Sequence, residues 1–274
     1  MKTKTLIIIY CLLFVQMASK PLHSQHMYFH LGGGYSMATG KQSMPNFFNC
    51  TETPDSKYVE QIRFSFGQGL NLQGSLGYMF NDYLGTEIGI NYLNCDNWRS
   101  KETYTDTLVS YTTAQNWKTT MVRINPNVIF QAEPAIVTPY CKIGILLGFG
   151  SISQEKYRNK SQTIEETWEL SGGMAIGFNT ILGANIELDD NMYVFTEVAI
   201  TRMNYSPTKG NLNTYLVNGV DKLSTLNKNT TEIEFVDNYN VLPAPTSGYP
   251  TQVFKQSHPF SNVGLNIGFR WTFK

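Results

Sequence analysis

Along eight segments of this chain, apolar residues occupy every second position and polar or small residues lie between them. The segment 260–273 shows the pattern most clearly, because large apolar residues from Val263 to Phe273 alternate with small or polar ones such as Asn266 and Arg270. A period of two is that of a β-strand with two unlike faces. The eight predicted strands are residues 26–37, 63–80, 83–94, 116–132, 137–153, 168–188, 192–205 and 260–273.

The links between these predicted strands alternate strictly between short and long. The short links carry residues that favour turns, whereas the long links are polar. The short ones are Asn81-Asp82, Glu133–Ala135 and Asp189–Asn191, and the long ones are 38–62, 95–115, 154–167 and 206–259. This order is typical of a transmembrane barrel with tight periplasmic turns and long extracellular loops. We therefore predict an all-β fold, an eight-stranded antiparallel up-and-down barrel with both chain termini on the periplasmic side.

Charged side chains within the predicted strands fall mainly on the face opposite the apolar one. A charge that faces lipid at the middle of the bilayer costs about 2–4 kcal/mol, so these side chains are expected to point into the barrel. In the strand 192–205, Glu197 and Arg202 have opposite parity, which places one of them near a rim or at a bulge. The predicted polar network of the lumen is Glu87, Arg123, Lys142, Glu187, Glu197 and Arg270.

The lumen of an eight-stranded barrel is just wide enough to be filled by side chains. Buried charges must be paired or hydrated, and the three basic and three acidic residues of the predicted network can satisfy one another. We therefore expect a filled, structural lumen, with a narrow porin-like solute channel as the alternative. A ten-stranded barrel that recruits two segments of 206–259 is the alternative architecture.

The composition agrees with strands that have one face in lipid. Only 15% of the residues are charged and 13% are aromatic, against about 25% charged residues in an average soluble protein. These values exclude a disordered chain and argue against a coiled coil or a helical bundle. The 21 basic and 21 acidic residues balance, so the chain lacks the positive excess that nucleic acid requires of a partner. Aromatic residues cluster near the predicted strand ends, as in the two interfacial girdles of membrane barrels.

The first 24 residues have the layout of a secretory signal peptide. Lys2 and Lys4 precede an apolar run of ten residues, which is too short to span a bilayer, and polar or small residues follow. We expect residues 1–24 to be removed on export and residues 25–274 to form one barrel domain, in which 206–259 is the longest extracellular loop. No later apolar stretch is long enough to predict a transmembrane helix.

No grouping of reactive side chains predicts a catalytic or metal site. The histidines and the three cysteines of the mature chain lack the spacing of metal ligands. The glycines at 32–34 precede no predicted helix, which argues against a phosphate-binding loop, and no G-x-S-x-G motif occurs. We therefore expect no enzyme activity and no cofactor, with a lipid-acting barrel enzyme as the least favoured alternative.

The predicted extracellular links carry two further features. Cys50 and Cys95 fall in the first two of these links, where an oxidising compartment permits a disulfide between them, whereas Cys141 is expected to face lipid. Within the longest link, Asn218-Gly219 between apolar residues predicts a β-hairpin. This link is longer than a simple connection requires, which favours a role in presenting a binding surface.

The C-terminal strand carries a polar residue, a glycine two positions later and aromatic residues at alternate positions near the chain end, namely Asn266, Gly268, Trp271 and Phe273. This ending resembles the terminal β-signal of outer-membrane proteins, which the barrel-assembly machinery reads. Together with the signal peptide and the eight strands, the mature chain resembles the small outer-membrane β-barrel family, which includes the OmpA transmembrane domain, OmpX and PorT-like proteins.

The resemblance implies a location in the outer membrane of a Gram-negative envelope. The implied partners are outer-membrane lipid, lipopolysaccharide, the barrel-assembly machinery and an extracellular or envelope protein, without nucleic acid. The implied function is non-catalytic and resides in the extracellular loops, as envelope integrity, adhesion or partner docking.

Overall fold

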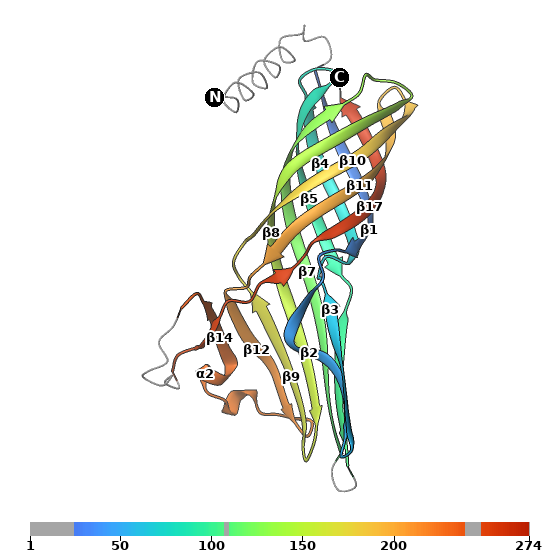
Figure 1. Ribbon diagram of the computed structural model, residues 1–274. Coiled ribbons are helices and arrows are strands. Elements are labelled where there is room, and N and C mark those ends of the chain that lie inside the picture. The colour runs from blue at the N-terminus through green and yellow to red at the C-terminus, as the bar shows by residue number, and fades with distance from the viewer. Residues whose placement is uncertain (1–24, 107–109, 239–247, 274) are drawn as a thin grey trace, which may run out of the picture.

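Eight strands close into an antiparallel barrel in the computed structural model, which describes residues 25–106, 110–238 and 248–273 (Figure 1). Each strand pairs with the next one around the barrel, and the last pairs with the first. The predicted eight-stranded fold is confirmed, whereas the predicted signal peptide, residues 1–24, lies outside the described residues. In order around the barrel the strands are β1 (His26–Ala38), β4 (Gly69–Met79), β5 (Leu84–Cys95), β7 (Ser110–Gln131), β8 (Val137–Asn159), β10 (Ala175–Asp189), β11 (Met192–Tyr205) and β17 (Asn262–Phe273).

The alternation of side chains gives the barrel an apolar outer surface. On β17, Leu265 and Ile267 are 63% and 64% exposed, whereas Asn266 between them is only 4% exposed. The parity conflict on β11 is resolved at a rim: Glu197 is buried inside the barrel, and Arg202 is exposed near the end of the strand. The pairing of β11 with β17 runs without a register shift, so no bulge is needed.

Side chains fix the short turns at one end of the barrel, where β1 begins and β17 ends. Between β4 and β5, Asn81 Oδ1 accepts the backbone N–H groups of Tyr83 and Leu84 at 2.9 and 2.8 Å. Before β8, Thr138 Oγ1 accepts the N–H of Ala135 at 3.1 Å and donates to its carbonyl at 3.0 Å. These bonds satisfy backbone groups that the ladder leaves unpaired at the turns. We call this the turn end of the barrel.

The segments predicted as long loops are mostly strands, and they build a sheet beyond the other end of the barrel (Figure 1). β7 and β8 extend past the barrel, and the added strands pair beside them in the order β3-β2-β6-β7-β8-β9-β12-β14-β15. We call this the outer sheet. Its added strands are β2 (Gln42–Thr53), β3 (Ser56–Phe64), β6 (Trp98–Thr105), β9 (Thr163–Ser171), β12 (Lys209–Val217), β14 (Glu232–Val236) and β15 (Thr251–Phe254), with the short elements β13 (Val220–Asp221), η1 (Leu223–Thr225), α2 (Lys228–Thr231) and β16 (His258–Pro259).

Two of the predicted strands each correspond to two observed strands, one in the outer sheet and one in the barrel, with a break between them. The predicted strand 63–80 contains the end of β3 and the start of β4, and 168–188 contains the end of β9 and the start of β10. The second break falls at Gly172 and Gly173, whose φ angles are 81° and 76°. Glycine adopts this left-handed backbone without steric cost, so the pair redirects the chain from the outer sheet into the barrel.

The longest predicted link, 206–259, is described apart from residues 239–247. The predicted hairpin at Asn218-Gly219 is confirmed, since both residues have positive φ angles, 52° and 77°, and they join β12 to β13. Such φ angles match a type I′ turn, whose twist suits a two-residue hairpin. Among the described residues, no helix is long and apolar enough to cross a membrane.

Candidate functional site: the filled lumen and the outer sheet

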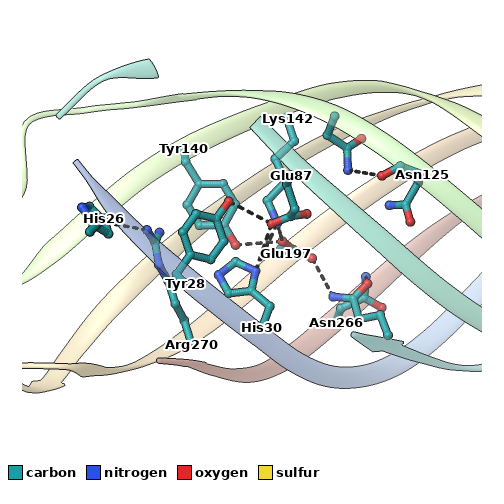
Figure 2. A network of polar contacts seen from close by, with 12 residues as sticks. His26, Tyr28, His30, Glu87, Asn125, Tyr140, Lys142, Glu197, Asn266 and Arg270 are labelled. Carbon is teal, nitrogen blue, oxygen red and sulfur yellow. Dashed lines mark hydrogen bonds and ion pairs between the residues drawn. The ribbon is translucent and has the colours of Figure 1, made fainter. Parts of the chain in front are cut away.

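A lysine and two glutamates meet inside the barrel, in the half nearer the turn end (Figure 2). Lys142 Nζ lies 3.0 and 2.9 Å from the two carboxylate oxygens of Glu87 and 2.7 Å from Glu197 Oε1. The three residues belong to β8, β5 and β11, which are not neighbours in the barrel, so the contacts cross the lumen. Each residue is at most 5% exposed. We call this group the ionic network.

Hydroxyl and amide groups complete the coordination of the two carboxylates. Tyr28 donates its hydroxyl to Glu87 Oε2 at 3.1 Å. Glu197 accepts from the Tyr140 hydroxyl at 2.9 Å and from Gln73 Nε2 at 2.8 Å. A buried charge is tolerated when its remaining lone pairs are satisfied in this way.

Two glycines make room for the tyrosines. A Cβ atom added at Gly77 would lie 2.0 Å from Tyr28 Cζ, and one added at Gly183 would lie 2.5 Å from Tyr140 Cζ. Real Cβ atoms do not approach other heavy atoms so closely, so these positions on β4 and β10 require glycine for the rings to reach the glutamates.

Rings and cations pack around the ionic network. The ring of His30 stacks on Phe195 with centroids 4.7 Å apart, and its Nδ1 lies 3.3 Å from Lys142 Nζ. The Arg270 guanidinium carbon lies 3.9 Å from the centroid of the Tyr28 ring, which is a cation–π contact. These contacts fill the space around the carboxylates with side chains.

The structure brings four of the predicted lumen residues together and places two elsewhere. Arg123 is buried apart from the network, and its Nε donates to Asn91 Oδ1 at 2.9 Å. Glu187 was predicted to join the network, which is wrong: it has inward parity, but it is exposed at the turn end of β10. Parity fixes the face of a strand but not the depth along it. The four that lie together are Glu87, Lys142, Glu197 and Arg270.

Sequence reasoning missed four members of this site, Tyr28, His30, Gln73 and Tyr140. Their inward parity is visible in the sequence, but tyrosine and histidine at strand ends also fit an interfacial girdle. Only the close approach of strands that are distant in sequence identifies their partners.

The predicted assembly signal lies on the strand that closes the barrel. Asn266 and Gly268 face inward, and Asn266 Nδ2 donates to Gln73 Oε1 at 3.5 Å. Trp271 stacks on Phe29 of β1 with centroids 6.1 Å apart, and Phe273 is exposed on the outer face. The signal residues therefore also take part in closing β17 on β1, and their reading by an assembly machine stays a prediction.

An aromatic cluster fills the barrel where it meets the outer sheet. His258 of β16 is fully buried in it, with ring centroids 5.9 Å from Phe66 and 6.1 Å from Trp117. Tyr205 anchors the cluster by donating its hydroxyl to the carbonyl of Gly150 at 2.7 Å. We call this group the aromatic plug; its members include Phe47, Phe64, Phe66, Leu93, Trp117, Met121, Ile152, Tyr205, Phe235 and Phe260.

All three described cysteines are free thiols, so the predicted Cys50–Cys95 disulfide is not formed. Cys95 instead packs in the aromatic plug, where its thiol donates to the carbonyl of Phe66 at 2.6 Å. Cys141 lies half-buried on the outward face of β8, as predicted. Among the described residues, no group of three or more histidine, cysteine or acidic side chains is placed to hold a metal ion.

The outer sheet offers a free edge and a hollow. Along the edge strand β3, Tyr58 and Val59 are 67% and 51% exposed. A hollow of about 650 Å³ lies over β6 to β9, with basic and acidic side chains side by side, including Arg99, Lys156 and Glu166. Of the two features, the free backbone edge is the one that can pair with a strand of another protein.

Comparison with known proteins places the fold in a family. The family model described as outer membrane protein beta-barrel domain matches residues 7–221. The chain belongs to this family. It is therefore an integral outer-membrane barrel protein. Bacterial barrels of this kind place their short turns in the periplasm and their longer connections outside the cell. A search of curated proteins found no match.

Removing the cation of the ionic network should strongly destabilise the barrel. We expect Lys142→Met to lower the free energy of unfolding by about 3–5 kcal/mol, because two buried carboxylates lose their partner. Lys118→Met is the control: Lys118 Nζ lies 2.5 Å from Glu155 Oε1, but both side chains are well exposed, and such a pair contributes about 0–1 kcal/mol. Urea unfolding in lipid vesicles measures both, and equal losses would contradict the assignment.

The aromatic plug should weaken in acid because of His258. Burial lowers the pKa of His258 to about 4 from its ordinary value of 6.5. Between these values the unfolded chain takes up the proton and the folded chain does not, so stability falls as the pH drops. We expect a loss of about 3 kcal/mol between pH 6.5 and pH 4, measured as the difference between the wild type and His258→Phe. Parallel stability curves for the two proteins would exclude this role of His258.

Proposed function

We propose that the protein is a closed membrane anchor that presents the outer sheet to a protein partner at the cell surface. The observation that carries the proposal is the continuity of β7 and β8, which run from the lipid-facing barrel into the outer sheet. The lumen of the barrel is filled by the ionic network and the aromatic plug. A sealed barrel with a large protruding sheet suits docking better than transport.

The edge strand β3 is the part of the outer sheet best suited to a partner. Among the described strands it pairs only with β2, and its residues Ser56–Gln61 are all exposed. A free backbone edge can accept an added strand from another protein, which then gains main-chain hydrogen bonds. The same surface would serve adhesion, envelope integrity or a PorT-like role in a secretion assembly.

We also propose that the protein is not an enzyme. Among the described residues, each histidine has a place that argues against a catalytic role at the extracellular rim. His30 packs against Lys142 in the lumen, His258 lies in the aromatic plug, and His26 lies beside Arg270 at the turn end.

We also propose that export removes residues 1–24 as a signal peptide. N-terminal sequencing of the mature protein tests this cleavage.

Photocrosslinking on intact cells tests the docking proposal. We expect benzoylphenylalanine at Tyr58 to form a discrete protein adduct, because this side chain lies on the free edge. Tyr157 is the matched control, since it is 40% exposed on β8 inside the same sheet but away from the edge. The double variant Tyr58→Asp/Val59→Asp should abolish the adduct formed from a second probe placed at Glu60.

Equal labelling from Tyr58 and Tyr157, or no adduct at either position under conditions where the partner cells or envelope are intact, would contradict a specific role for the edge. Heat-modifiable mobility on gels confirms for each variant that the barrel is folded.

A further inference from the structure

A polar cavity of about 570 Å³ opens at the turn end of the barrel, on the periplasmic side of the ionic network. Its inner wall holds Arg270 and Asn185, which are 5% and 2% exposed. Its rim carries Glu187 and Asp190, both exposed, and Tyr193 lies between rim and wall. The volume lies within the range of small-molecule sites.

The strand register brings an acid and a base to the same side of this cavity. Glu187 on β10 is opposite Tyr193 on β11, and Tyr193 is opposite Arg270 on β17. Neighbouring strands lie about 4.8 Å apart, so the backbones of Glu187 and Arg270 are separated by about 10 Å. The two charges therefore face one cavity across a tyrosine.

Two residues of the cavity wall each have a buried polar atom without a hydrogen-bond partner among the described residues, Arg270 Nε and Asn185 Oδ1. The same guanidinium already uses one terminal nitrogen, 3.3 Å from His26 Nε2, and one face against the Tyr28 ring. A buried donor or acceptor left unpaired costs about 1–3 kcal/mol.

We propose that the cavity binds a diamino acid, either free or at the carboxyl end of a peptide, from the periplasm. The carboxylate accepts hydrogen bonds from Arg270, the kind of contact that guanidinium groups make most strongly. In the free amino acid both ammonium groups face Asn185 Oδ1, Glu187 and Asp190; at the carboxyl end of a peptide only the side-chain ammonium does, because the α-nitrogen is then an amide. The side chains that line the cavity include the guanidinium of Arg270, the imidazole of His26 and the carboxylates of Glu187 and Asp190, so a ligand with a carboxylate and at least one ammonium group finds an opposite charge for each. The ionic network closes the inner end, so the ligand binds without crossing the membrane, and the inference does not depend on the proposed docking function.

Calorimetric titration of the folded full-length mature protein in detergent micelles tests the site. The probes are lysine, the tripeptide Ala-Ala-Lys, 1,5-diaminopentane, which lacks the carboxylate, and glutarate, which lacks the ammonium groups. We expect lysine or the tripeptide to bind at least about tenfold more tightly than the other two probes, the gain of one good charged contact. The tighter of the two distinguishes a free amino acid from a peptide end.

A pair of variants in one turn supplies the control. Asp190→Asn should weaken lysine binding by about tenfold, whereas Asp189→Asn should leave it unchanged, because Asp190 lines the cavity and Asp189 does not. Equal effects of the two variants, equal binding of 1,5-diaminopentane, equal binding of glutarate, or no binding of lysine and the tripeptide would each overturn the proposal.

Discussion

Lys142 lies in contact with both Glu87 and Glu197 and so offsets their buried negative charge inside the barrel. A barrel in lipid can place charge only on its inner face, and eight strands leave no room there for bulk water. The charges must therefore satisfy one another across the lumen. Tyr28 and Tyr140 reach the carboxylates only because each is paired with a glycine on the neighbouring strand, Gly77 and Gly183, which leaves space for its ring.

The aromatic plug links this barrel to the outer sheet. Its side chains come from barrel strands, such as Met121 of β7, and from added strands, such as Phe64 of β3 and Phe235 of β14. The plug is thus both the second closure of the lumen and the apolar core at the base of the outer sheet. A sheet that shares strands and a core with a membrane barrel is held rigidly to it, which suits a docking surface.

Much of the barrel could be predicted from the sequence, because lipid on one side forces a strict alternation that appears directly in segments such as 262–273. The inward face of Glu87, Lys142, Glu197 and Arg270 followed from the same alternation. Apart from the hairpin at Asn218-Gly219, the outer sheet could not be predicted, since most of its added strands lack a continuous apolar face. The depth of Glu187, the separation of Arg123 and the free thiol of Cys95 depend on strand stagger and packing that no local pattern records.

Side chains fill the barrel at two levels, the ionic network and the aromatic plug, so we expect it to anchor the outer sheet without conducting ions. Single-channel recording of the purified, folded protein in planar lipid bilayers measures this conductance. We expect a silent membrane, without steady current steps, over a wide range of voltage. Large, steady and reproducible steps from the wild-type protein would contradict it.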